Sequence, residues 1–158
     1  MIVRRAVALD APAVAAIMNN VIANTTATFT TVLKSQAQVI SDISPPNPCL
    51  VLEIDGTVCG YARYFPFRSG PGYAHVAEYS IALTDQAKGQ GAGRALLERL
   101  CQLARDNGKS QMIGAISGNN LAALAFHTAM GFAKVGQLPG VGIKWGETLD
   151  LIIVQKHL

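Results

Sequence analysis

Apolar and polar residues follow two different periods along the chain, and together they predict a mixed α/β fold. Short apolar or alternating runs are typical of β-strands, and they fall at 2–7, 50–54, 58–64, 73–83, 112–116, 133–137 and 149–155. Apolar residues at helical spacing fall at 13–22, at 35–43, from the glycine-rich stretch 89–93 to 107, and at 120–130. The order predicts hairpins first and crossover connections later.

Capping and turn residues set the expected boundaries. Asp10 offers an N-cap to the first helix, with Pro12 in its first turn. Asp55-Gly56 predicts a tight hairpin between two apolar strands, and Asn107-Gly108 predicts the end of the longest helix. At this length we expect a single domain, residues 1–158.

Composition narrows the class of protein. Half of the residues are hydrophobic and 15% are charged, which is enough apolar material for a core. The formal net charge is +3, and the Lys and Arg residues are scattered, so no nucleic-acid partner is expected. No apolar run approaches 18 residues, and the first ten residues lack the apolar region of a signal peptide. We therefore expect a cytoplasmic protein without a membrane partner.

The cysteines and histidines predict no metal site. Cys49, Cys59 and Cys101 lie in apolar stretches without metal-ligand spacing, so buried thiols are expected. The three histidines, at 75, 127 and 157, also lack such spacing.

The most informative stretch is the glycine-rich turn at 88–94, between a strand and the longest helix. Backbone N–H groups at a helix start bind phosphate well, and glycines let the anion approach closely. The stretch lacks the Gly-Lys-Ser/Thr end of a P-loop, and Arg94 or Leu96 stands where a dinucleotide-binding turn needs a small residue. A phosphate of another ligand is expected, with an ordinary glycine-rich helix start as the alternative.

Two segments resemble the acetyltransferases of the GNAT family. Lys88-Gly89-Gln90-Gly91-Ala92-Gly93 is similar to the family's pyrophosphate loop, Arg/Gln-x-x-Gly-x-Gly/Ala, with Lys88 in place of Arg or Gln. The segment from Asn120 to Phe132, where Asn opens a helix and Gly-Phe ends it, is similar to a second family motif. Two motifs in this order favour the family over an isolated capped helix with a partly buried His127.

The resemblance implies the GNAT fold, an α/β architecture with a central, mixed, mostly antiparallel twisted sheet flanked by about four helices. It implies acetyl-CoA as co-substrate and no metal. The pyrophosphate would lie on the glycine loop, and the pantetheine arm along a splayed strand and a helix stripe. The implied cofactor-binding residues are Ile81, Ala82, Leu83, Lys88, Gly89, Gln90, Gly91, Ala92, Gly93, Arg94 and Asn120.

Other segments resemble the branch of phosphinothricin and methionine sulfone or sulfoximine acetyltransferases. They lie at 24–29, at 73–80 and at 138–150, and this branch often has His at the position of His127. The branch implies an amino-acid acceptor and a homodimer, with Lys144 contributing across the interface. Ser69-Gly70 and Glu147-Thr148 depart from the branch in regions that shape the acceptor pocket. The implied substrate-binding residues are Phe29, Arg68, Tyr73, Glu78, Tyr79, Ser80 and Lys144.

Acetyl transfer needs a neutral amine, a polarised thioester carbonyl and a proton for the leaving thiolate. Glu78 lies in an otherwise apolar strand and is the expected base, a solvent-facing strand residue being the alternative. His127 is the expected proton donor to sulfur. Arg68 is the expected partner of a substrate carboxylate, with a solvated loop arginine as the alternative.

Two other functions stay open on the sequence. One is acetylation of a protein N-terminus or another small amine, and the other is a non-catalytic acyl-CoA sensor. A peptide acceptor needs an open groove, whereas the aromatic-rich stretch 61–79 favours a closed pocket. Glu78 and His127 favour an enzyme, so we expect an amino-acid N-acetyltransferase.

Overall fold

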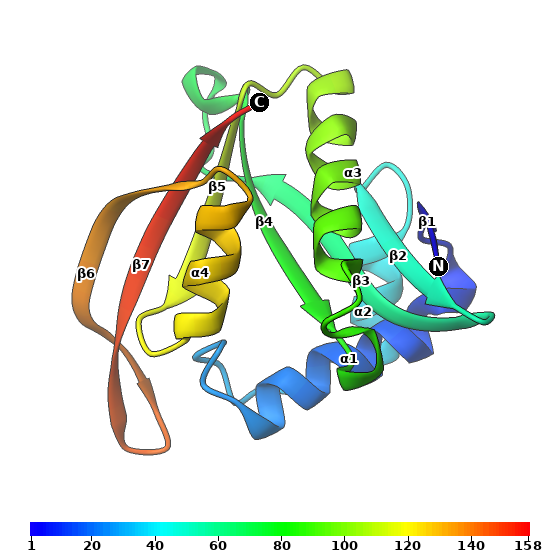
Figure 1. The fold of residues 1–158 in the computed structure, drawn as a ribbon, viewed down its shortest axis with the longest axis horizontal. Coiled ribbons are helices and arrows are strands. Elements are labelled where there is room, and N and C mark those ends of the chain that lie inside the picture. The colour runs from blue at the N-terminus through cyan, green and yellow to red at the C-terminus, as the bar shows by residue number, and fades with distance from the viewer.

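A single twisted sheet organises the computed structural model, which describes residues 1–158 (Figure 1). Seven strands form it in the order β1-β2-β3-β4-β5-β7-β6. The strands are β1 Ile2–Arg5, β2 Cys49–Ile54, β3 Thr57–Pro66, β4 Val76–Leu83, β5 Gln111–Ser117, β6 Ala133–Lys144 and β7 Glu147–His157. The helices are α1 Ala11–Asn24, α2 Gln36–Ile43, α3 Ala92–Asp106 and α4 Leu121–Ala129, with 3-10 turns at Ala8–Asp10, Pro71–Tyr73 and Asp85–Ala87.

All neighbouring strands are antiparallel except β4 and β5. That one parallel pair exists because α3 carries the chain back across the sheet between the two strands, as parallel pairing requires. The expected mixed, mostly antiparallel sheet is confirmed.

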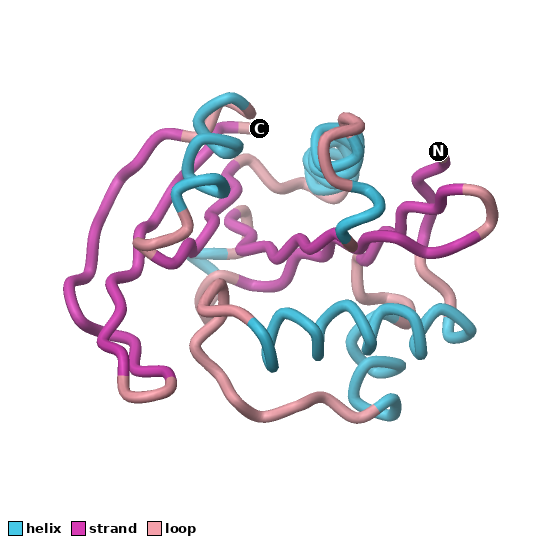
Figure 2. The backbone as a smooth tube through the Cα atoms, turned by 60° about the horizontal axis from the view of Figure 1, so that its bottom comes forward, coloured by secondary structure: helices cyan, strands magenta, loops and turns pink.

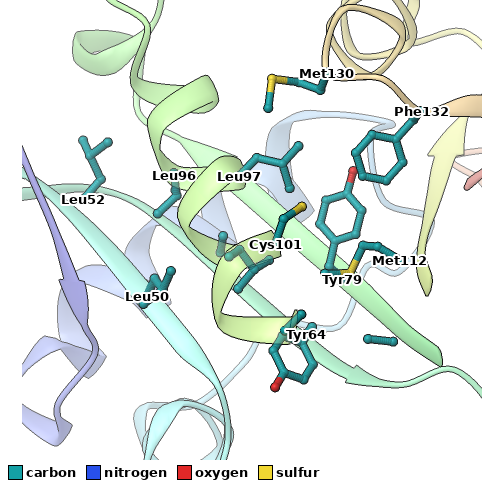
Figure 3. Close-up of a cluster of buried hydrophobic side chains, with 14 of the residues drawn as sticks. Leu50, Leu52, Tyr64, Tyr79, Leu96, Leu97, Cys101, Met112, Met130 and Phe132 are labelled. Atoms are coloured by element: carbon teal, nitrogen blue, oxygen red, sulfur yellow. The ribbon is translucent and has the colours of Figure 1, made fainter. Parts of the chain in front are cut away.

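Helices cover both faces of the sheet, with α1 and α2 on one face and α3 and α4 on the other (Figure 2). The larger core lies under α3, whose Leu96, Leu97 and Leu100 are fully buried against the sheet (Figure 3). The second core lies under α1 and α2. Because the sheet has a core on each face, successive side chains of β4 point to opposite faces, and Ala77 and Tyr79 point toward the α3 side.

Two expected boundaries differ by three residues or more, and one expected helix cap is not formed. The strand expected from residue 73 begins at Val76, because Pro71–Tyr73 forms a 3-10 turn. The strand expected at 133–137 continues to Lys144, because β6 is an edge strand that accommodates Pro139 and two register shifts. Asp10 precedes α1 as expected, but its carboxylate binds Arg4 and the Val7 N–H rather than capping that helix.

The three cysteines are buried free thiols, as expected. No group of three or more His, Cys, Asp or Glu side chains is arranged to hold a metal ion. None of the helices combines the length and the apolar character that crossing a bilayer requires.

Candidate active site

The site begins where β4 and β5 separate. Their parallel pairing runs from Val76 opposite Gln111 to Tyr79 opposite Gly114 and ends there, although β4 continues to Leu83. Figure 1 shows the two strands diverging toward their C-terminal ends. On its other edge β4 stays paired with β3 as far as Leu83. Beyond Tyr79, therefore, the edge of β4 that faces β5 has no strand partner, as expected for Ile81, Ala82 and Leu83.

A cavity of about 820 Å³ fills the space between the diverging strands. Its walls come from the end of α1, the 25–30 loop, β3, β4, β5 and the start of α4. The cavity brings together eight of the residues expected in the site: Tyr79, Ser80, Ile81, Ala82, Leu83, Lys88, Asn120 and His127. Residues separated by up to about fifty positions in sequence thus share one lining.

The glycine loop forms the N-terminus of α3. The first backbone N–H bond inside this helix is donated by Ala95 to the Gly91 carbonyl, so the N–H groups of Ala92, Gly93 and Arg94 have no helical acceptor. These groups and the helix dipole make the loop suited to an anion. Lys88 adds a positive charge beside the loop, and its Nζ lies 2.5 Å from Asp85 Oδ1.

The glycines of this loop have different roles. Gly89 and Gly91 both have φ +75°, which disfavours any residue with a Cβ. Gly93 does not have a positive φ, but a Cβ at this position would lie 3.3 Å from the Phe126 ring, so the close packing of that ring requires a small residue. Both properties fit the expected register that starts at Lys88, with Gly91 at its Gly position and Gly93 at its Gly/Ala position.

Helix α4 presents Asn120 and His127 to the cavity. Asn120 is the N-cap, and its Oδ1 accepts a hydrogen bond from the Ala123 N–H at 3.2 Å. His127 is buried, and its Nδ1 lies 2.6 Å from the Ala123 carbonyl oxygen. A carbonyl only accepts, so Nδ1 carries the proton. Burial lowers the pKa of His127, which favours a neutral ring with a bare Nε2.

Glu78 lies one residue before the point of separation. It is opposite Phe65 on β3 and Ile113 on β5, and no ion pair or side-chain hydrogen bond is formed by its carboxylate. Partial burial raises the pKa of Glu78. Glu78 is not itself part of the cavity lining, but its neighbours Phe65 and Ser80 are.

Tyr79 occupies the point of separation itself. The residue is only 6% exposed, and its hydroxyl has no hydrogen-bond partner. The ring packs beside His127 and Phe132, and in Figure 3 the hydroxyl end points toward Phe132. Burial raises the pKa of Tyr79, so the phenol stays protonated and remains available as a donor.

The other residues expected to bind the acceptor lie outside the lining. Arg68 is exposed and sits over the Tyr73 ring, its Cζ 6.0 Å from the ring centroid. Phe29 packs directly on Gly142 of β6, where a Cβ would overlap the ring. Lys144 is 1% exposed and is enclosed by its own chain.

Lys144 anchors the wall of the cavity rather than lining it. Its Nζ donates hydrogen bonds to the backbone carbonyls of Ile22, Thr25 and Thr28 at 2.7, 2.6 and 2.9 Å. All three carbonyl-bearing residues line the cavity. The buried ammonium therefore fixes the end of α1 and the loop that follows it.

Two basic residues of the lining, Lys34 and Arg63, were not expected in the site. Both lie beside Asp42 of α2: Lys34 Nζ is 2.7 Å and Arg63 Nη1 is 2.9 Å from Asp42 Oδ2. For Arg63 a signal was available, because a charged residue in the apolar run 58–64 is as unusual as Glu78 in its strand. Lys34 gave no such signal, since it lies in a polar stretch.

A further polar contact spans the mouth between the 25–30 loop and α4. Asn119 Nδ2 donates to Thr26 Oγ1 at 3.1 Å, and the Asn119 amide oxygen accepts from Ser117 Oγ at 2.8 Å. Asn119 and Thr26 both line the cavity. This bridge ties the loop to the end of β5.

Comparison with known sequences agrees with this geometry. A model of the acetyltransferase (GNAT) family matches residues 19–132. An L-amino acid N-acyltransferase, MnaT, of Escherichia coli is 42% identical over 111 residues, which cover 70% of this chain and 64%, under two thirds, of that protein. An L-methionine sulfoximine/L-methionine sulfone acetyltransferase of Pseudomonas aeruginosa is 35% identical over 161 residues, 99% of this chain and 94% of that protein.

Comparison with solved structures gives the same fold. A ribosomal-protein-alanine N-acetyltransferase from Brucella melitensis has a TM-score of 0.94 and 36% identity, and the match covers 100% of both chains. A phosphinothricin acetyltransferase from Sinorhizobium meliloti, solved in complex with acetyl-CoA, has a TM-score of 0.93 and 33% identity over 99% of this chain and 88% of that one. The resemblance inferred from the sequence is confirmed.

Proposed function

Because the chain belongs to the acetyltransferase (GNAT) family, we propose that it transfers the acetyl group of acetyl-CoA to the primary amine of a small amino acid or amino-acid analogue. The observation that carries the proposal is the separation of β4 from β5 over a cavity of about 820 Å³. The acceptor class is supported by relatives named as acting on L-amino acids and on methionine sulfoximine or sulfone.

The chain offers a fitting surface for each part of acetyl-CoA. The N–H groups of Ala92, Gly93 and Arg94 suit the pyrophosphate, together with Lys88, Gly89, Gln90 and Gly91 around them. The free edge of β4 at Ile81, Ala82 and Leu83 suits the amides of the pantetheine arm, because an unpaired strand edge offers backbone donors and acceptors. Asn120 also lines the cavity, and its side-chain N–H₂ group, which has no partner in the protein, suits a carbonyl of the same arm.

Glu78 is the proposed base. It takes a proton from the acceptor ammonium, directly or through water, and the freed nitrogen lone pair attacks the thioester carbon. Its raised pKa makes Glu78 a stronger base than an exposed carboxylate. A backbone N–H on the free edge of β4 is suited to receive the charge that develops on the carbonyl oxygen, and the carbon–sulfur bond then breaks to release the thiolate.

The role of His127 depends on its protonation state. Its Nδ1–H is already bonded to the Ala123 carbonyl, so only the charged ring has a proton on Nε2 to give to sulfur. The lowered pKa makes the charged ring a minor form at neutral pH. Donation from His127 is therefore expected to fade as the pH rises through this lowered pKa, before neutrality is reached.

An acceptor screen tests the proposal. Purified protein is mixed with acetyl-CoA and one acceptor at a time, and free thiol release is followed. The acceptors are the L-amino acids, methionine sulfone, methionine sulfoximine, phosphinothricin and simple primary amines. Thiol release that depends on an amino acid, with the acetylated product identified by mass, is the expected result. No release with any small amine would refute the proposal.

Acetylation of a protein N-terminus is the second candidate function. It is favoured by the name of the Brucella melitensis structure, a ribosomal-protein-alanine N-acetyltransferase. The same screen includes peptides with a free N-terminal alanine. Thiol release with these peptides, and none with free amino acids, would support N-terminal acetylation instead of amino-acid acetylation.

We also propose that the protein is a cytoplasmic homodimer. The edge strand β6 and its turn expose Val135, Leu138, Val141, Ile143 and Trp145, and each is more than 40% exposed. Such a row of apolar side chains on an edge strand suits a second copy. Three free thiols suit a reducing compartment. Light scattering after size exclusion is expected to give twice the mass of one chain, and a monomer at micromolar concentration would contradict the dimer.

A further inference from the structure

The charges of the cavity lining are all of one sign. Lys34, Arg63 and Lys88 line the cavity, and no Asp or Glu does. Lys88 follows the C-terminal end of β4 beside the glycine loop, so the pyrophosphate accounts for it. The mechanism above gives Lys34 and Arg63 no role. The positive charge of these two residues requires its own explanation.

Asp42 neutralises only one of these two cations. It lies on α2, outside the lining, and its Oδ2 atom contacts both Lys34 Nζ and Arg63 Nη1. Two cations share one carboxylate, so the three groups together carry one net positive charge. The Arg63 Nη1 atom is also buried without a hydrogen bond of good geometry, although it lies 2.9 Å from Asp42. The Arg63 side chain as a whole is 19% exposed, and its other N–H groups form no hydrogen bond within the protein, so they can serve an acceptor in the cavity.

The strand register places this charge next to the proposed base. Arg63 is directly opposite Ser80, and Phe65 is directly opposite Glu78, in the antiparallel pair of β3 and β4. Residues opposite one another point to the same face, so Arg63 and Glu78 are diagonal neighbours on one face. Diagonal neighbours have Cα atoms about 7–8 Å apart, and long side chains bridge that distance. An α-amino acid carries its amine and its carboxylate on one carbon, so it fits between such a base and such a cation.

We infer that Arg63, supported by Lys34, binds the carboxylate of the amino-acid acceptor. The inference rests on the proposed function and names the specificity-determining residue within it. Arg68, the residue expected from sequence for this role, is exposed, stacks on Tyr73 and lies outside the cavity lining. The planar guanidinium of Arg63 suits a two-point hydrogen bond to a carboxylate, and Lys34 adds a point charge beside it.

The test compares one acceptor with and without its carboxylate. Methionine sulfone and 3-(methylsulfonyl)propylamine are assayed at saturating acetyl-CoA with wild type, Arg63→Met, Arg68→Met and Arg105→Met. Arg105 lies in the last turn of α3, is not part of the cavity lining, and is the matched control. Arg63→Met is expected to lower kcat/KM for the sulfone by about 10- to 150-fold. The rate with the propylamine should change by no more than about threefold, because that acceptor lacks the anion.

Each outcome decides between the two arginines. If Arg63→Met keeps the wild-type preference for the carboxylate and Arg68→Met loses it, the inference is overturned. Equal rates of the wild type on both acceptors would overturn it as well, while leaving the proposed function intact. No thiol release with either acceptor would instead refute the proposed function. If Arg63→Met does not fold, Lys34→Met is the deciding variant, because the Lys34 side chain is more exposed than that of Arg63. For Lys34→Met we expect a smaller loss of kcat/KM, and only with the sulfone.

Discussion

Replacing the buried ammonium of Lys144 tests how the cavity wall is held. Lys144→Met keeps a long, unbranched side chain but removes the donor that binds three backbone carbonyls, at 22, 25 and 28. Each hydrogen bond from a charged group contributes about 1.5–3 kcal/mol, and loss of the donor leaves one buried and two part-buried acceptors unpaired. The desolvation of the ammonium, which also lowers the pKa of Lys144, offsets part of that sum. We expect a net loss of about 3–5 kcal/mol in the free energy of unfolding.

Urea unfolding followed by circular dichroism measures this loss as a lower midpoint with an unchanged m-value. For a chain of this size the loss corresponds to a fall in Tm of about 6–20 °C. Lys134→Met is the matched control, because Lys134 lies exposed on the same strand and bonds only Gln137. The control should change stability by less than about 0.5 kcal/mol. A loss below about 1 kcal/mol for Lys144→Met would mean that desolvation cancels the three bonds, and would refute the reasoning.

The same variant has a kinetic consequence. Thr25 and Thr28 line the cavity on the side of the proposed acceptor site, whereas the glycine loop of α3 does not contact Lys144. A folded Lys144→Met protein should therefore show a higher KM for the acceptor and an almost unchanged KM for acetyl-CoA. Equal increases in both KM values would point to general unfolding instead of a loosened wall.

Three further predictions concern the site. Glu78→Gln should lower kcat by about 100-fold or more. Because the pKa of Glu78 is raised in the folded protein, its charged form lowers stability above that pKa, so thermal melts should find the variant slightly more stable at neutral pH. Gly91→Val should raise the KM for acetyl-CoA, whereas the control Gly56→Val, at φ +78° in the hairpin between β2 and β3, should lower only stability. An unchanged KM in a folded Gly91→Val protein would show that the loop is not part of the acetyl-CoA site. Tyr79→Phe removes a hydroxyl without a hydrogen-bond partner and should leave the free energy of unfolding, measured in urea, unchanged or higher. Tyr64→Phe removes the hydrogen bond with Asn107 and should lower it by about 1 kcal/mol, so equal losses in the two variants would contradict the prediction.

Much of the fold was predictable because its signals are local. The hairpin at Asp55-Gly56, the burial of Leu96, Leu97 and Leu100 and the start of α4 at Asn120 all follow from neighbours within a few residues. The long β6 was not predictable from local signals. Its Pro139 breaks a strand pattern, and only the edge position in the sheet makes a proline there acceptable.

The same division holds for the site. The sequence by itself determined the glycine loop, the polar stripe of α4 and Glu78 in its apolar strand, because each is a contiguous pattern with its own chemistry. Only the tertiary structure decided which charged residues meet. Lys144 reaches carbonyls 116 to 122 positions away, and Lys34 and Arg63 converge on Asp42 from a loop and a strand. Such convergence depends on how α1 and α2 pack over the sheet, and a charge in a loop or strand carries no local sign of the partner that packing brings to it.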